Sequence, residues 1–162
     1  MCIVHCAFFF NFAVVKVKII ENIEDFPQFE AQNVFQTKEW MHLFEKEDDT
    51  KVVIFAVYAN AQLDAIRNME NPQLLLLQPV TIQRFVKWLP WRVGAHAVAW
   101  REPWKAKNIT DKEAQQLFEV LQKAINQYCR RKAIYIEYRH FSENNIYHLK
   151  HYCKKIRLFY GP

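Results

Sequence analysis

The chain has 162 residues, 51% of them apolar and 24% charged, which is enough to bury the core of one domain and argues against a disordered chain. Only two glycines occur, Gly94 and Gly161, and this excludes phosphate-binding loops such as the Walker motif or GxGxxG, which need closely spaced glycines. The net charge of +5 is uneven, because residues 129–162 carry eight basic and two acidic side chains. Such a basic end either attracts acidic partners or is simply a solvated helix end and tail.

The amino-terminal residues 1–13 are an apolar extension that precedes the first predicted strand. They lack the basic start of a signal sequence and are too short to span a bilayer. The four cysteines are too few and too scattered to form a disulfide framework in a chain of this length. We therefore expect a cytoplasmic protein without a transmembrane segment.

Residues 14–20 alternate as Val-Val-Lys-Val-Lys-Ile-Ile, which predicts a strand with one solvated face. Residues 21–32 are acidic and contain a proline, which predicts an irregular turn or short helix. Within residues 34–45, Thr37 is suited to cap a short amphipathic helix whose apolar stripe is Trp40, Leu43 and Phe44. A strand over 51–58, a hairpin turn at 59–61 and a second strand over 62–67 follow.

The second half of the chain contains the clearest predicted element, a long helix over about 111–131. A buried strand from Leu74 toward residue 86, a loop of aromatic residues at 88–91 and a strand over 93–100 precede it. Thr110 and Glu113 form a capping box at its start. Its apolar face consists of Ala114, Leu117, Phe118, Leu121, Ala124, Ile125 and Tyr128. A buried strand over 133–139 follows directly.

This order of elements predicts a single α/β (α+β) domain over residues 14–141. The sheet is expected to be mixed but mainly antiparallel, with the long helix packed on one face. Residues 142–162 form a basic, aromatic segment that continues beyond the domain.

Four segments in this order resemble a known family. They are Phe35-Gln-Thr-Lys-Glu-Trp40, the predicted hairpin over 52–67, the capped helix over 111–131 and Tyr135-Ile-Glu-Tyr-Arg139. Together they resemble the N-terminal domain of FemABX-type peptidoglycan-bridge aminoacyltransferases, whose domains have the acyl-CoA N-acyltransferase (GNAT-like) fold. The resemblance covers roughly residues 16–141; the segment from 144 onward departs from the family pattern.

The resemblance implies a transferase that moves an aminoacyl or acyl group onto an amine of a peptidoglycan precursor. Family members pair two such domains, and the second completes the donor and acceptor sites. We therefore expect a truncated member that needs a second GNAT-like half or a partner subunit. By family position, Gln36, Thr37 and Trp40 line the substrate cleft.

Glu137 and Arg139 are the second candidate pair, because they alternate on the last predicted strand and so share one face. A carboxylate and a guanidinium in this arrangement can bind the zwitterionic end of a peptide or position a base. A structural role is the simpler interpretation for all five candidates: Thr37 as a helix cap, Trp40 as core, and Glu137 with Arg139 as an ion pair.

No cofactor and no metal are expected for this chain. GNAT enzymes hold the donor pyrophosphate on a glycine-rich loop, whereas residues 107–111 contain no glycine and Asp111 opposes an anion at this helix start. Cys2 and Cys6 lie far in sequence from His148, His151 and Cys153, so neither cluster has the ligand spacing of a zinc site. A nucleophilic pair of Cys129 and His140 is disfavoured because Cys129 lies beside the apolar face of the helix.

The alternative function is a binding module without catalysis. Basic and aromatic residues are interleaved in two segments, 84–92 and 148–160, which can stack on bases and neutralise phosphates. Nucleic acid, a lipid headgroup or a protein partner on which the chain docks would then be its ligand.

Overall fold

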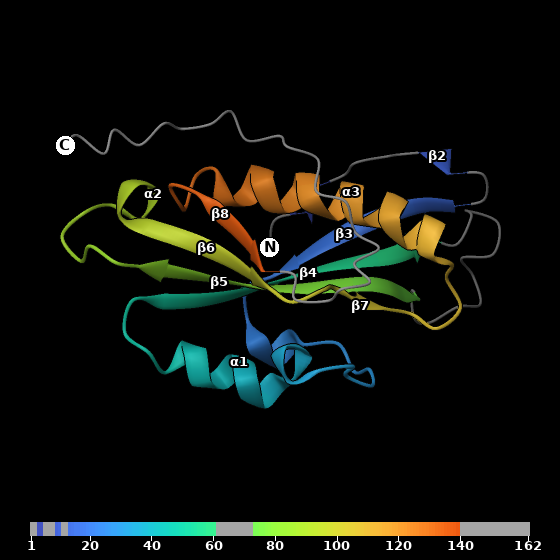
Figure 1. Ribbon diagram of the computed structural model, residues 1–162, viewed down its shortest axis with the longest axis horizontal. Helices are drawn as coiled ribbons and strands as arrows, with labels where there is room; N and C mark the ends of the chain where they lie inside the picture. Colours follow the sequence, from blue (N-terminus) through green and yellow to red (C-terminus); the bar gives the residue numbers. More distant parts are fainter. Residues whose placement is uncertain (1–2, 5–8, 11–12, 61–72, 140–162) are drawn as a thin grey trace.

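A mostly antiparallel sheet with a helix on each face makes up the part of the chain that the computed structural model describes, residues 3–4, 9–10, 13–60 and 73–139 (Figure 1). The strands are β1 (Ile3–Val4), β2 (Phe9–Phe10), β3 (Ala13–Ile20), β4 (Thr50–Asn60), β5 (Leu74–Arg84), β6 (Ala95–Trp100), β7 (Trp104–Lys105) and β8 (Ile136–Arg139). The helices are α1 (Lys38–Glu45), α2 (Trp91–Gly94) and α3 (Asp111–Cys129), with 3-10 turns at η1 (Ile23–Asp25) and η2 (Val34–Gln36). The predicted mixed class and mainly antiparallel sheet are therefore confirmed.

The strands follow the order β1-β3-β4-β5-β6-β8 across the sheet, with β2 paired to β3 and β7 paired to β5. All described pairs are antiparallel except β6 and β8, which run parallel with Ala97 opposite Ile136 and Trp100 opposite Arg139. Parallel neighbours need a crossover connection, and α3 supplies it. As a result, the carboxyl ends of β6 and β8 lie side by side.

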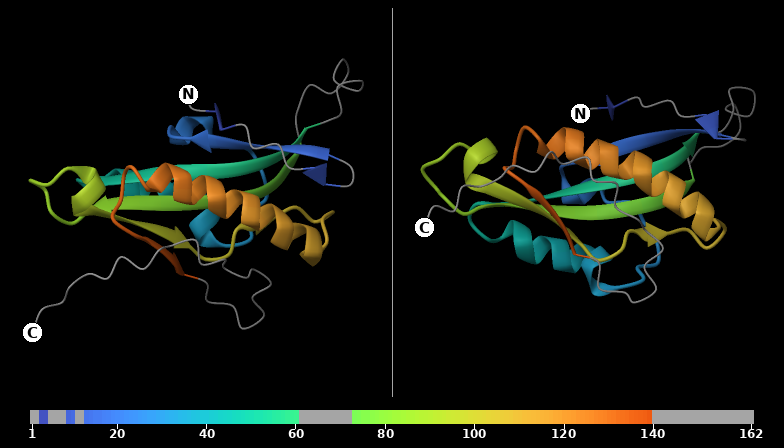
Figure 2. Two further views of the ribbon diagram at one scale, coloured as in Figure 1. Left: turned by 90° about the horizontal axis from the view of Figure 1, so that it is seen from above. Right: turned by 45° about the horizontal axis from the view of Figure 1, so that its top comes forward.

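The long helix α3 packs across one face of the sheet, as Figures 1 and 2 show. Its start is the predicted capping box, because the Thr110 side chain accepts from the Glu113 N–H while the Glu113 carboxylate accepts from the Thr110 N–H. Six of the seven predicted apolar positions are buried against the sheet, and Tyr128 is partly buried beside them. The helix ends at Cys129, with Arg130 as its cap, close to the predicted end.

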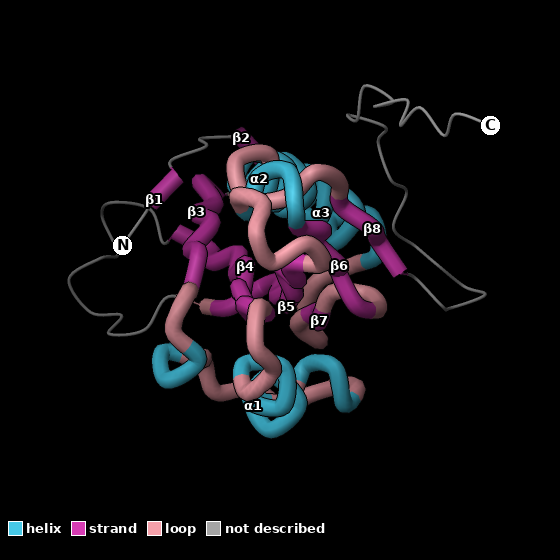
Figure 3. Tube along the Cα trace, turned by 90° about the vertical axis from the view of Figure 1, so that its left-hand side faces the viewer, coloured by secondary structure: helices cyan, strands magenta, loops and turns pink. Residues whose placement is uncertain are grey.

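The short helix α1 covers part of the opposite face and buries a second core (Figure 3). Thr37 caps it as predicted, but the predicted stripe is wrong at Leu43, whose exposed fraction is 62%, whereas Met41 is fully buried. Trp40 and Phe44 form a compact helical stripe with either Leu43 or Met41, so periodicity does not choose between them. The choice follows from contacts, because Met41 packs with Ile20, Ile23 and Ile54.

Two predicted strands begin later in the structure than expected. The strand predicted over 93–100 begins only at Ala95, because residues 91–94 form the single turn α2. Gly94 ends this turn where a Cβ would lie 2.8 Å from the Leu89 Cβ and 2.9 Å from the Val86 carbonyl oxygen. The strand predicted as buried over 133–139 is β8, which begins at Ile136 and is only partly buried because it pairs with β6 alone in the described sheet.

Several predicted segments lie outside the described residues, namely the hairpin strand 62–67, most of the extension 1–13 and the segment 142–162. The hairpin turn predicted at 59–61 is wrong at residues 59 and 60, because β4 continues to Asn60. This strand pairs with β5, with Tyr58 opposite Leu74. Of the helices described, none combines the length and the apolar character needed to cross a bilayer.

Candidate functional site

Four aromatic side chains gather where α1 meets the carboxyl end of β6, and we refer to them as the aromatic platform: Phe35, Trp40, Phe44 and Trp100. Trp100 is their common neighbour, with its ring stacked on Phe35 and edge-on to Trp40, both at 5.9 Å between centroids. Phe44 contacts both tryptophans. The indole N–H of Trp100 donates to the Thr81 hydroxyl at 2.9 Å, which holds the ring against the sheet.

Two guanidinium groups lie on this platform. The Arg139 guanidinium carbon is 4.5 Å from the centroid of the Trp100 ring, and that of Arg101 is 5.7 Å from the centroid of Phe35. Arg101 has a backbone φ of 57°, a left-handed conformation that non-glycine residues adopt rarely and that is frequent at binding sites. Its N–H donates to the Arg139 carbonyl at 2.8 Å, so both arginines are tied to the carboxyl ends of β6 and β8.

Glu137 and Arg139 form a two-bonded ion pair next to the platform. The Arg139 Nη2 donates to Glu137 Oε2 and its Nε lies near Oε1, each at 2.9 Å. The side chains retain 42% and 35% of their exposure, so a ligand can reach both. The hydrogen bond from Arg139 lowers the pKa of Glu137, which therefore stays a carboxylate at neutral pH.

His96 continues the same row of side chains toward the amino end of β6. Its ring stacks on Tyr135 at 5.5 Å between centroids, and it interacts electrostatically with Glu137. Burial is the main cause that lowers the pKa of His96, so the imidazole is neutral at pH 7. A neutral imidazole beside a carboxylate can accept a proton from a bound amine.

The five candidates from the sequence all belong to this region, but they have different structural roles there. The Gln36 side chain is buried, accepts from the Gln32 N–H at 2.9 Å and donates to the Glu102 carbonyl at 3.3 Å. Thr37 accepts from the Trp40 N–H at 3.3 Å as the helix cap. These two residues thus hold the backbone that presents Trp40. Trp40 is partly buried and packs against the second core, in line with its structural interpretation, whereas Glu137 and Arg139 are partly exposed.

Sequence reasoning did not assign His96, Trp100 or Arg101 to the site, nor Phe35 and Phe44 of the platform. A signal existed for the first two, since they are four apart in a predicted strand and therefore share a face. The contact between Trp100 and Arg139 depends on the parallel register of two strands that α3 separates in sequence. No local pattern predicts that register.

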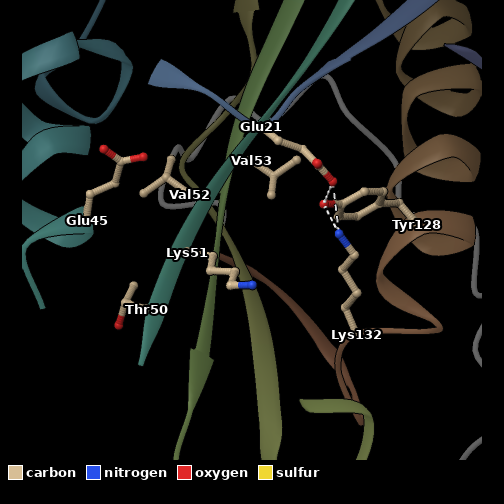
Figure 4. A pocket seen from close by; sticks show the side chains of 8 residues that line it. All are labelled: Glu21, Glu45, Thr50, Lys51, Val52, Val53, Tyr128 and Lys132. Carbon is tan, nitrogen blue, oxygen red and sulfur yellow. Dashed lines mark hydrogen bonds and ion pairs between the residues drawn. The ribbon is translucent and has the colours of Figure 1, made fainter. Parts of the chain in front are cut away.

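A separate pocket of about 400 Å³ lies at the carboxyl end of β3 and the amino end of β4 (Figure 4). The pairing of β3 with β4 ends at Ile54, so residues 50–53 of β4 extend past β3. The lining residues are Glu21, Glu45, Thr50, Lys51, Val52, Val53, Tyr128 and Lys132. In Figure 4, Lys51 and Val53 point to the side of Tyr128, while Thr50 and Val52 point to the side of Glu45.

A hydrogen-bonded network of Glu21, Tyr128 and Lys132 occupies one side of this pocket (Figure 4). The Tyr128 hydroxyl donates to the Glu21 carboxylate, and the Lys132 ammonium donates to the same oxygen at 2.9 Å. Both hydrogen bonds lower the pKa of Glu21 from its ordinary value, and the bond from Tyr128 has the larger effect. The pKa of Glu21 is lower in the folded chain than in the unfolded chain, so this network stabilises the fold above about pH 4.3, the ordinary Glu pKa. Its contribution is lost as the pH falls through the folded-state pKa.

Replacing Tyr128 by phenylalanine is therefore expected to raise the pKa of Glu21 toward its ordinary value. The substitution removes the hydroxyl and keeps the ring that packs on Phe55. A ¹³C NMR titration of the glutamate carboxyl groups measures the change. Glu113 is the internal control, because its pKa is lowered by Thr110 and should not move. An unchanged pKa for Glu21 would show that the hydroxyl does not control its protonation.

Neither a metal centre nor a reactive thiol is found in the described part of the chain. Its His, Cys, Asp and Glu side chains form no group of three or more that could hold a metal ion. Burial raises the pKa of Cys129 to about 12, so this thiol is not a nucleophile at neutral pH and serves as core, as predicted. The other metal candidates and His140 lie outside the described residues.

Comparison of the chain with protein-family models, with curated proteins and with solved structures found no match.

Proposed function

We propose that this chain is the acceptor-binding lobe of an acyl- or aminoacyl-transferase with a GNAT-like fold. It would hold an amine of a peptidoglycan precursor or a similar peptide at the carboxyl ends of β6 and β8. The observation that carries the proposal is that the Glu137 carboxylate and the Arg139 guanidinium are both partly exposed, with the guanidinium lying over the Trp100 ring. An amino acid or peptide end with an ammonium and a carboxylate group matches that pair of charges.

The order of the elements supports the proposed GNAT-like fold. A first strand, a short helical segment, a three-stranded antiparallel meander, a long helix and a strand parallel to the last meander strand follow one another. In open α/β sheets, ligands commonly bind outside the carboxyl ends of such strands. Trp100, Arg101 and Arg139 lie at that position.

The chemistry assigns a role to each charged group. In acyl transfer to an amine, the amine nitrogen bonds to the donor carbonyl carbon, the bond to the leaving group breaks, and a proton leaves the nitrogen. Glu137 would attract the ammonium form, and Arg139 and Arg101 would bind the carboxylate. Neutral His96 would accept the proton whose loss turns the ammonium into a nucleophilic amine, and the leaving group of the donor would take up the second proton, which the nitrogen loses as the amide forms. The donor would be held by the second half or partner subunit that the family resemblance implies.

The proposal is tested by titration calorimetry with a lysine-containing stem tripeptide of peptidoglycan. Exchanging the charges in the double variant E137R/R139E keeps an ion pair on the same strand face, so the melting temperature should stay close to that of the wild type. Binding is expected to weaken about 10–100-fold, because each charge-assisted hydrogen bond is worth about 1.5–3 kcal/mol.

The same tripeptide with its lysine amine acetylated is the matched ligand control, and it should bind the wild type as weakly as the intact peptide binds the variant. Equal affinity of wild type and E137R/R139E for the tripeptide would contradict the proposal. Binding of RNA that weakens steeply with salt would instead favour the alternative, a nucleic-acid module. That alternative has less support from the fold, since α1 and α3 cover much of the two sheet faces.

A further inference from the structure

Three arginines from two separate elements converge on one pocket at the end of the molecule where α2 lies. Arg92 belongs to α2, while Arg130 and Arg131 follow the carboxyl end of α3. Together with Gln127 they line a pocket of about 320 Å³. Figure 3 views the molecule from this end, with α2 in front of α3.

Among the described residues, no carboxylate lines this pocket. None of the ion pairs found among the described residues involves Arg92, Arg130 or Arg131, and all three side chains are exposed. Asp49 pairs with Arg84 and Lys87, and Glu21 pairs with Lys132. Arg84, Lys87 and Lys132 therefore have acidic partners in the described structure, whereas the three arginines that line the pocket have none there.

Like charges that share a small pocket repel one another, and an anion between them removes that cost. The negative pole at the end of α3 favours cations near Arg130 and Arg131, but it does not account for Arg92, which comes from another element. Guanidinium groups bind phosphate oxygens through two parallel hydrogen bonds, so three of them suit a ligand with several oxygens and more than one negative charge.

We propose that Arg92, Arg130 and Arg131 form a binding site for a phosphate or diphosphate group. Two sources can present that group, a free phosphorylated small molecule or the headgroup of an anionic lipid. Exposed apolar side chains on the neighbouring β5–β6 connection bear on this choice: Trp88 is 83% exposed, Phe85 54% and Val93 45%. An indole that projects into solvent beside basic residues is typical of surfaces that meet a lipid headgroup region.

The site is independent of the proposed acceptor site. Arg92 precedes the amino end of β6, whereas Trp100 and Arg139 lie at the carboxyl ends of β6 and β8. His96 is the acceptor-site residue on β6 that lies toward this end, but none of the residues that line the pocket belongs to the acceptor site. Loss of one activity therefore does not imply loss of the other.

The first experiment titrates the full chain with inorganic pyrophosphate at low ionic strength by calorimetry. The double variant R130Q/R131Q is expected to weaken binding at least tenfold, and R92Q about three- to tenfold, because each removes charge-assisted hydrogen bonds. The double variant K46Q/K112Q removes the same charge from exposed positions elsewhere and should change the affinity by less than twofold. Absence of binding to the wild type, or equal weakening in K46Q/K112Q, would overturn the proposal.

The second experiment identifies the source of the phosphate group by comparing phosphatidylglycerol vesicles with phosphatidylcholine vesicles in a sedimentation assay. A lipid headgroup as ligand predicts binding to the former only, with Trp88 to alanine weakening it severalfold while leaving pyrophosphate affinity unchanged. A free phosphorylated ligand predicts pyrophosphate binding without vesicle binding. Vesicle binding that survives R130Q/R131Q undiminished would show that these arginines do not recognise the phosphate.

Discussion

Replacing Phe118 by alanine is expected to lower the free energy of unfolding by about 3–5 kcal/mol, the range for removal of a fully buried aromatic side chain. Phe118 is fully buried in α3 within the core between that helix and the sheet, and its ring meets Tyr138 of β8 edge-on. The substitution leaves a cavity where the helix crossover joins β6 to β8. Urea denaturation followed by circular dichroism measures the loss.

Phe85 is the matched control for this substitution, because it is the same residue type with 54% of its surface exposed. Its replacement by alanine should change the free energy of unfolding by no more than about 0.5 kcal/mol. If both variants lost stability equally, α3 would not pack on the sheet as described. A large loss confined to Phe118 would also show that the crossover core is part of the cooperative unit.

Replacing Met41 by alanine is expected to destabilise the fold by about 2–5 kcal/mol, whereas Leu43 to alanine should cost no more than about 0.5 kcal/mol. The two residues lie two positions apart in α1, but Met41 is fully buried and Leu43 is 62% exposed. Met41 contacts the core formed with Ile20, Ile23 and Ile54, and alanine would leave that space empty.

The same denaturation experiment on the two variants measures which face of α1 meets the sheet. A larger loss for Leu43 than for Met41 would mean that the helix is rotated about its axis toward the stripe that periodicity suggested. Such a rotation would also displace Trp40 and Phe44 from the aromatic platform. The stability of these two variants is therefore a test of the candidate site as well as of the core.

The arginine pocket lies toward the amino end of β6, whereas Trp100 and Arg139 of the proposed acceptor site lie at the carboxyl ends of β6 and β8. The two sites are tested by different binding experiments, with the tripeptide and with pyrophosphate, so one proposal can fail while the other is supported.

The candidate site was only partly predictable from the sequence. The alternation of Glu137 and Arg139 placed them on one strand face, and the structure confirms that they form an ion pair. The ring beneath Arg139 is that of Trp100, which lies 39 positions earlier in the chain and reaches it only through the parallel register of β6 and β8. The scarcity of glycine argued against glycine-rich cofactor loops, but it gave no information about these contacts.

The sequence by itself determined the elements that depend on neighbouring residues. The capping box at Thr110 and the apolar face behind it specify α3, and period-two alternation specifies β3, because these signals act over one or two turns or a few strand residues. Only the tertiary structure decided that β8 pairs parallel to β6, that Met41 and not Leu43 is buried, and that Arg92 lines one pocket with Arg130 and Arg131. Each of these arrangements depends on contacts between segments that lie far apart in the chain. Their free energies come from the packing of a whole core, so no short stretch of sequence predicts them.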